Sequence, residues 1–316
     1  MTNKSIGGYF ELETGKMLSS PHFMGIALNT ARNALEYILL TKRAQKIFIP
    51  YFTCDVLLEP VKKLQIPFEF YNINRDLEPV FDFSVLRKDD IFLYTNYFGL
   101  KDKYILELTS NHTGVIIDNA QAFYAIPHDN VATFYSPRKF FGVADGAYLY
   151  CDVKIGKRLK KDISNNRMSH LLIRKDLSAE AGYNSFVMND KLLENQSIKR
   201  MSSLTKAILS SVNYDDAAKK RIKNYVFLEN ILRESNQFTL NLEKGAVPMV
   251  YPYWSKDKYL RKRLLENKIY TATYWPNVKR WCEEKSLEYI LTDEVVYLPI
   301  DQRYGLADMK KILQYV

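Results

Sequence analysis

The chain has 316 residues, 47% hydrophobic and 26% charged, which fits a globular protein with room for two domains, and it has no apolar run near the about 18 residues of a membrane span. The net charge of +9 comes entirely from the residues beyond 150, which carry 30 Lys+Arg and 20 Asp+Glu. A solvated lysine-rich surface is the simplest interpretation, and a basic rim that attracts an anionic substrate is the alternative. The short basic clusters have no nucleic-acid motif beside them, so we expect neither nucleic-acid nor membrane partners.

Short apolar runs alternate with helical patterns in the first half of the chain. Apolar stripes at helical spacing predict helices over 31–39 and 56–64. Strands are predicted at 46–49, 68–71, 91–94, 115–117, 131–135 and 147–150. This alternation predicts an α/β fold with a mostly parallel sheet covered by helices.

The pattern changes after about residue 152. Two helical stripes, over 201–212 and 218–232, lead to a boundary at Asn236. A strand at 249–253, a helix at 259–266, a strand at 295–298 and a helix at 307–315 follow. We therefore predict a large domain over 1–235 and a smaller C-terminal α/β domain over 236–316.

Polar side chains follow two successive apolar runs. Asp118 and Gln121 come just after the run 115–117, and Ser136 and Lys139 just after the run 131–135. The carboxyl ends of parallel strands meet at one edge of a sheet, so we expect these four side chains to converge where ligands of α/β proteins bind. An acid, a hydroxyl and a lysine gathered there are the groups that hold a pyridine cofactor through a Schiff base.

These residues also have simpler interpretations. Asp118, followed three residues later by Gln121, fits the capping box at the start of a helix. Lys139 fits a solvated basic turn, although Tyr135 and Phe140 nearby would reduce its hydration and make its amine easier to deprotonate. The sequence alone leaves both alternatives open.

A second anion site is expected where the first strong helix begins, at 29–33. Free backbone N–H groups and the positive end of a helix bind phosphate, and plain capping by Asn29 or Thr30 is the alternative. The four histidines have no metal-like spacing to one another or to cysteine, so we expect no metal site.

The three cysteines, Cys54, Cys151 and Cys282, are far apart and odd in number. That argues against a disulfide framework and for a reducing compartment. The polar N-terminal residues 1–5 lead into no signal-type apolar segment. We therefore expect a cytoplasmic protein.

Taken in order, these segments resemble the DegT/DnrJ/EryC1/StrS family, the sugar aminotransferases among the fold-type I pyridoxal-phosphate-dependent enzymes. The similarity is spread over most of the chain. The matching segments are 28–35 (phosphate-binding helix start), 49–54 (Pro-x-x-Thr), 94–99 (strand end), 117–123 (Asp-x-Ala-Gln), 133–139 (lysine segment), 200–202 and 298–300.

The resemblance implies a role for each residue around the cofactor ring. Lys139 would bind pyridoxal 5′-phosphate covalently and serve as the catalytic residue. Asp118 would pair with the pyridine nitrogen, and Gln121 would contact the ring hydroxyl. Cys54 occupies the position of the side chain that usually stacks on the ring.

The resemblance also implies a phosphate site and substrates. The N–H groups of Arg32 and Asn33 would join Ser136 at the phosphate. Members of the family transfer an amino group, usually from glutamate, to nucleotide-linked keto-sugars, and they form homodimers with sites at the subunit interface. In the C-terminal part, Tyr274, Trp275 and Arg303 could contact substrate, with core and surface roles as the simpler interpretation.

The sequence thus predicts a pyridoxal-phosphate-dependent aminotransferase that acts on a nucleotide-linked keto-sugar for surface glycan synthesis. Several positions differ from the family pattern: Cys54 replaces an aromatic residue, Phe134 a serine and Ile198 an asparagine, and a gapless alignment puts Arg138 at the lysine position. These differences motivate an alternative, a non-catalytic member of the same fold that binds a nucleotide-sugar or a partner as a scaffold or regulator.

Overall fold

The computed structural model describes residues 12–15, 18–156 and 158–316. The N-terminal residues on which the prediction of no leader segment rests lie outside the described residues. In the described part, eight strands form one sheet in the order β1-β8-β7-β6-β5-β2-β3-β4, and β9 and β10 form a separate antiparallel pair. The strands are β1 (Ile26–Leu28), β2 (Lys46–Pro50), β3 (Phe68–Ile73), β4 (Pro79–Val80), β5 (Asp90–Thr95), β6 (Val115–Asn119), β7 (Ala132–Tyr135), β8 (Ala147–Tyr150), β9 (Tyr251–Trp254) and β10 (Val295–Leu298).

The five central strands, β3, β2, β5, β6 and β7, run parallel, and β1, β8 and β4 pair antiparallel toward the two edges. This confirms the predicted α/β fold with a mostly parallel sheet. The helices are α1 (Ala31–Lys42), α2 (Leu58–Lys63), α3 (Asp102–Asn111), α4 (Ser169–Asp176), α5 (Ala179–Leu192), α6 (Ser203–Ser210), α7 (Tyr214–Leu232), α8 (Leu260–Glu266), α9 (Val278–Trp281), α10 (Leu287–Glu294) and α11 (Leu306–Leu313).

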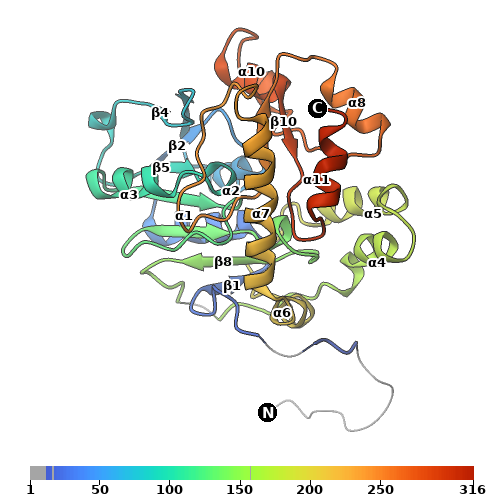
Figure 1. Cartoon of the computed structure of the whole chain (residues 1–316). Coiled ribbons are helices and arrows are strands. Elements are labelled where there is room, and N and C mark those ends of the chain that lie inside the picture. The colour runs from blue at the N-terminus through green and yellow to red at the C-terminus, as the bar shows by residue number, and fades with distance from the viewer. Residues whose placement is uncertain (1–11, 16–17, 157) are drawn as a thin grey trace, which may run out of the picture.

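Both faces of the sheet are covered. Along β5, Ile91 and Leu93 point into a core shared with α1 and α2, whereas Phe92 and Tyr94 point into the larger core shared with α3, α7 and the C-terminal elements. Successive side chains of a strand alternate between faces, which explains why central strands buried on both sides appear as continuous apolar runs. Figure 1 shows α7 crossing in front of the sheet, with α8, α10, β10 and α11 grouped beside it.

The C-terminal segment is joined to the large sheet near the ends of its strands. Asn277 Nδ2 donates to Thr53 O at 2.8 Å, and Met249 N–H donates to Phe98 O at 2.8 Å. The division into domains at residue 236 stays a prediction.

The connectivity places several segments at one edge of the sheet. β1 is antiparallel to β8, and β8 is antiparallel to β7, so β1 runs in the same direction as β7. The start of α1 therefore lies at the same edge as the carboxyl ends of β2, β5, β6 and β7.

No helix in the described part of the chain is long and apolar enough to cross a membrane.

Candidate functional site

Asp118 is the next-to-last residue of the buried strand β6 and does not lie at a helix start. β6 extends to Asn119, a turn follows, and no helix begins there, so the capping-box interpretation is wrong. Instead, Asp118 Oδ1 accepts the N–H of Ala120 at 2.8 Å, and the side chain is 5% exposed. Burial raises the pKa of this carboxyl, and the Lys139 ammonium and the Ala120 N–H partly oppose that rise.

Gln121 is held by the neighbouring strand end and keeps one donor free. Its Oε1 accepts the N–H of Phe98 at 3.2 Å. The backbone at Phe98 and Gly99 has φ of 60° and 73°, and a Cβ at Gly99 would lie 2.9 Å from Val247 O, so this turn requires a glycine. Gln121 Nε2 is buried and has no hydrogen-bond partner among the described residues, which leaves a donor for a ligand acceptor.

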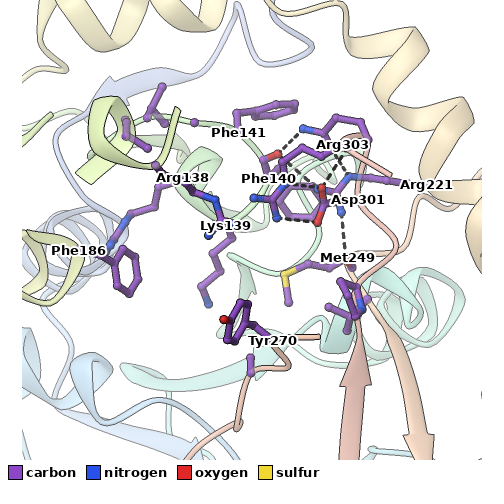
Figure 2. Close-up of a pocket in the computed structure, with 18 of the residues that line it drawn as sticks. Arg138, Lys139, Phe140, Phe141, Phe186, Arg221, Met249, Tyr270, Asp301 and Arg303 are labelled. Carbon is purple, nitrogen blue, oxygen red and sulfur yellow. Dashed lines mark hydrogen bonds and ion pairs between the residues drawn. The ribbon is translucent and has the colours of Figure 1, made fainter. Parts of the chain in front are cut away.

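Lys139 and its neighbour Arg138 have different surroundings. Arg138 Nη2 donates to Asp190 Oδ1 on α5 at 2.5 Å, so its charge is neutralised there. Lys139 has no carboxylate within 4 Å of its Nζ among the described residues. Figure 2 shows the two side chains diverging, Lys139 toward Tyr270 and Arg138 toward Phe186. The arginine at the gapless lysine position is thus bound to α5, whereas Lys139 has no ion-pair partner in the part of the chain that the structure describes.

Cys54 belongs to the same cluster as Asp118 and Lys139. It follows β2 and precedes a 3-10 turn over Asp55–Leu57. Burial raises the pKa of the Cys54 thiol, the Lys139 ammonium opposes that rise, and the Asp118 carboxylate adds to it. Three of the residues predicted from separate segments therefore lie within electrostatic range of one another.

Ser136 is the hydroxyl placed nearest to Lys139 in the chain. It is 4% exposed, and its carbonyl oxygen accepts the N–H of Lys139 at 3.3 Å. Phe134 is fully buried in the core beneath α1, and Thr133 Oγ1 donates to Val131 O at 3.2 Å. Of these side chains, Ser136 therefore remains as the candidate anion contact.

The start of α1 is capped as the simpler interpretation expected. Thr30 Oγ1 accepts the N–H of Asn33 at 3.1 Å, so that N–H is already donated. The guanidinium of Arg32 pairs with Glu59 at 2.6 Å, while the backbone N–H groups of Ala31 and Arg32 have no acceptor among the described residues. The predicted phosphate contact thus remains available to Arg32 N–H, and the contact assigned to Asn33 would need the cap to open.

A cavity of about 740 Å³ lies beside Lys139. Lys139 is the residue that it shares with the cluster, because Cys54, Asp118, Gln121 and Ser136 do not line it. Six cationic side chains surround it with Asp301 as the single carboxylate: Arg138, Lys139, Arg174, Lys175, Arg221 and Arg303. A pocket of this size, with several cations, suits an anionic ligand.

Two of these lining residues were named from the sequence as possible substrate contacts, and a third was missed. Tyr274 and Arg303 were considered as substrate contacts and do line the cavity, whereas Trp275 does not. Arg221 was not anticipated, because it falls on the helix over 218–232 between apolar positions of the predicted stripe. No described group of three or more His, Cys, Asp or Glu side chains could hold a metal ion.

The chemistry of these residues fits a pyridine cofactor. Asp118 offers a buried carboxylate whose Oδ2 has no partner among the described residues, Gln121 offers an unpaired N–H, and Lys139 offers an amine without a counter-ion. A ring with a protonated nitrogen and an acceptor oxygen would satisfy the first two. Ser136 and Arg32 N–H could hold an anionic group.

No protein-family model matches the sequence, and no curated protein matches it. Solved structures do share its fold. DesV from S. venezuelae, solved with a ketimine intermediate, is 15% identical with a TM-score of 0.65, covering 92% of this chain and 83% of DesV.

Two further solved structures also share the fold of this chain. A DegT DnrJ EryC1 StrS aminotransferase from Brucella abortus is 16% identical with a TM-score of 0.61, covering 92% of this chain and 84% of its own. NtdA from Bacillus subtilis, solved with the cofactor PMP, is 14% identical with a TM-score of 0.63, covering 94% and 76%. The resemblance that the motifs indicated therefore extends to the fold over most of the chain.

Proposed function

We propose that the protein is a pyridoxal-phosphate-dependent aminotransferase that acts on a nucleotide-linked keto-sugar. The observation that supports this most directly is the unpaired Lys139 beside the buried Asp118, at the carboxyl edge of a sheet that the chain shares with solved aminotransferases. NtdA, with the same fold, binds the related cofactor PMP.

When bound, pyridoxal phosphate would withdraw electrons from the carbon that carries the transferred amino group. The residues of the chain would then have separate tasks. Asp118 would hold a proton on the pyridine nitrogen, because a carboxylate raises the pKa of a base beside it. Gln121 Nε2 would donate to the ring hydroxyl. The Nζ of Lys139 would carry a proton to and from the reacting carbon.

The cavity and the resemblance both support the proposed substrate class. Four of the six cations around the cavity, Lys139, Arg174, Lys175 and Arg221, have no carboxylate partner among the described residues. They favour a ligand with several negative charges, and the diphosphate of a nucleotide-sugar meets that requirement. An amino acid, glutamate by the resemblance, would serve as donor. The product would be an amino-sugar for surface glycan synthesis.

A homodimer is part of the same proposal. Large apolar side chains on α4 and α5 are exposed in the single chain, among them Tyr183 at 62% and Met188 at 55%, and a second subunit would cover such a surface. The three cysteines are unpaired, which supports the proposed cytoplasmic location.

The test compares two adjacent cations. Purified protein mixed with pyridoxal phosphate should develop a visible absorption band from the covalent link to Lys139. Lys139→Ala should abolish the band, and the matched control Arg138→Ala should keep it. A band that survives in Lys139→Ala, or that Arg138→Ala alone removes, would reject the assignment.

The alternative is a non-catalytic member that binds a nucleotide-sugar or a partner as a scaffold or regulator. Cys54 favours it, because a thiol lacks the π-face that would stack on a cofactor ring. Amino transfer from glutamate to any nucleotide-linked keto-sugar would exclude this alternative. Nucleotide-sugar binding without an absorption band would support it.

A further inference from the structure

Arg221 on α7 is a buried cation without a counter-ion. Its side chain is 1% exposed, and no carboxylate lies within 4 Å of its guanidinium among the described residues. Nε donates to Gln302 Oε1 at 2.9 Å, Nη1 to Met249 O at 2.9 Å and Nη2 to Phe140 O at 3.3 Å. Three of its five N–H groups are thus donated to neutral acceptors, and two remain.

Such a position is costly for a charged group. Burial lowers the pKa of Arg221 to about 10, and Asp301 nearby only partly offsets that effect. Asp301 is itself bound by Arg303, whose Nε donates to its Oδ1 at 2.7 Å. The three side chains together keep one net positive charge. Figure 2 shows them close together, with dashed lines for their hydrogen bonds and ion pair.

The uncompensated charge faces the reaction side of the molecule. Arg221, Asp301 and Arg303 all line the cavity that Lys139 also lines. Arg221 contacts the carbonyl oxygen of Phe140, the residue directly after Lys139. An anion seated on this guanidinium would therefore lie on the same wall as the proposed reacting amine.

We propose that Arg221, supported by Arg303, is the binding site for an oxyanion of the substrate in the cavity beside Lys139. The inference rests on the proposed function and goes beyond it by assigning a residue to ligand recognition. The fork of a guanidinium matches a carboxylate or a phosphate through two parallel hydrogen bonds, and two free N–H groups are what that geometry needs.

The oxyanion has two possible sources in a transamination, the carboxylate of the amino donor and the diphosphate of the acceptor. Two probes distinguish them without any turnover. Glutarate has the two carboxylates of a five-carbon donor and no amine to react. Inorganic pyrophosphate represents the acceptor's diphosphate.

The experiment measures binding of each probe to the full-length protein by calorimetry. Arg221→Met should weaken the probe that uses this site by about 30-fold or more, because it removes one partner of a buried charge pair. Lys223→Gln is the matched control: it also removes a cation from α7, but an exposed one that does not line the cavity, and should change affinity by less than about threefold.

Arg221→Lys keeps the charge, and it tests whether the guanidinium binds the anion if Arg221→Met fails to fold. It loses the guanidinium fork and should weaken binding by about tenfold. A selective loss for glutarate assigns the anion to the donor, and a selective loss for pyrophosphate assigns it to the acceptor; both support the site. Wild-type affinity for both probes in Arg221→Lys would overturn it. Since the measurement needs no catalysis, that failure would leave the Lys139 absorption test untouched.

Discussion

The buried ring of His22 leads us to predict that the free energy of unfolding falls in acid. Its ring is 2% exposed and packs against Phe123, Tyr135, Tyr148 and Tyr150. Nε2 lies 2.5 Å from Phe123 O, and Nδ1 lies 3.3 Å from the hydroxyl of Tyr150. The neutral ring therefore donates from Nε2 and accepts at Nδ1, and it anchors the segment that follows Asp118 and Gln121.

The magnitude follows from the lowered pKa. Burial lowers the pKa of His22 from 6.5 to about 4, with the Phe123 carbonyl partly opposing the change. Between those pH values the unfolded chain binds a proton that the folded protein does not, so the free energy of unfolding falls as the pH falls. At about 1.4 kcal/mol per pH unit, His22 alone accounts for a loss of about 3 kcal/mol between pH 7 and pH 4.

The assay is urea unfolding of the wild type and of His22→Gln at several pH values between 7 and 4. Glutamine can keep an N–H for Phe123 O but does not titrate. The variant should lose about 3 kcal/mol less than the wild type over this range. Parallel profiles for the two proteins would refute the account of His22 as a buried neutral ring.

Three further changes test the site and its support. Asp118→Asn should lower the rate of amino transfer by about 100-fold, measured as glutamate turnover, because an amide cannot hold the proton on the cofactor nitrogen. Cys54→Tyr should tighten pyridoxal-phosphate binding by about fivefold in a fluorescence titration, since it restores an aromatic face beside the ring. Arg167→Met should cost about 3–5 kcal/mol in urea unfolding, because it leaves the buried carboxylate of Asp145 without a cation, while Asp162 keeps its ion pair with Lys199.

Local patterns were sufficient to predict the central strands. A strand such as β6 is buried on both faces, so its residues Val115, Ile116 and Ile117 form an uninterrupted apolar run that periodicity detects directly. The same pattern could not decide the role of Asp118 and Gln121. An acid and an amide three residues apart fit a helix cap equally well, and only the tight turn after β6 excludes it.

The burial of Arg221 could not be predicted from the sequence, for a different reason. The predicted stripe over 218–232 placed five apolar residues toward the core: Ala218, Ile222, Tyr225, Leu228 and Leu232. The last three are buried, but Ala218 and Ile222 are not, and Ala217, Arg221 and Asn224 are buried in addition. The burial of Arg221 and Asn224 depends on carbonyl groups far away in the chain, among them Met249 O and Ile300 O. Polarity patterns cannot anticipate partners that only the tertiary fold supplies.

Which of Arg138 and Lys139 is ion-paired could also be learned only from the fold. Alignment by spacing favoured the arginine, and the ion pair of Arg138 with Asp190 on α5 is a contact between distant segments. Lys139, near Asp118 and Cys54, has no carboxylate partner among the described residues, which agrees with the proposed covalent link to the cofactor.

The most direct test of the central claim is to locate the cofactor on the chain. The protein loaded with pyridoxal phosphate would be reduced with borohydride, digested and mapped by mass spectrometry. The account predicts one pyridoxyl-phosphate group on Lys139. A group found only on another lysine, or no covalently retained cofactor, would contradict it.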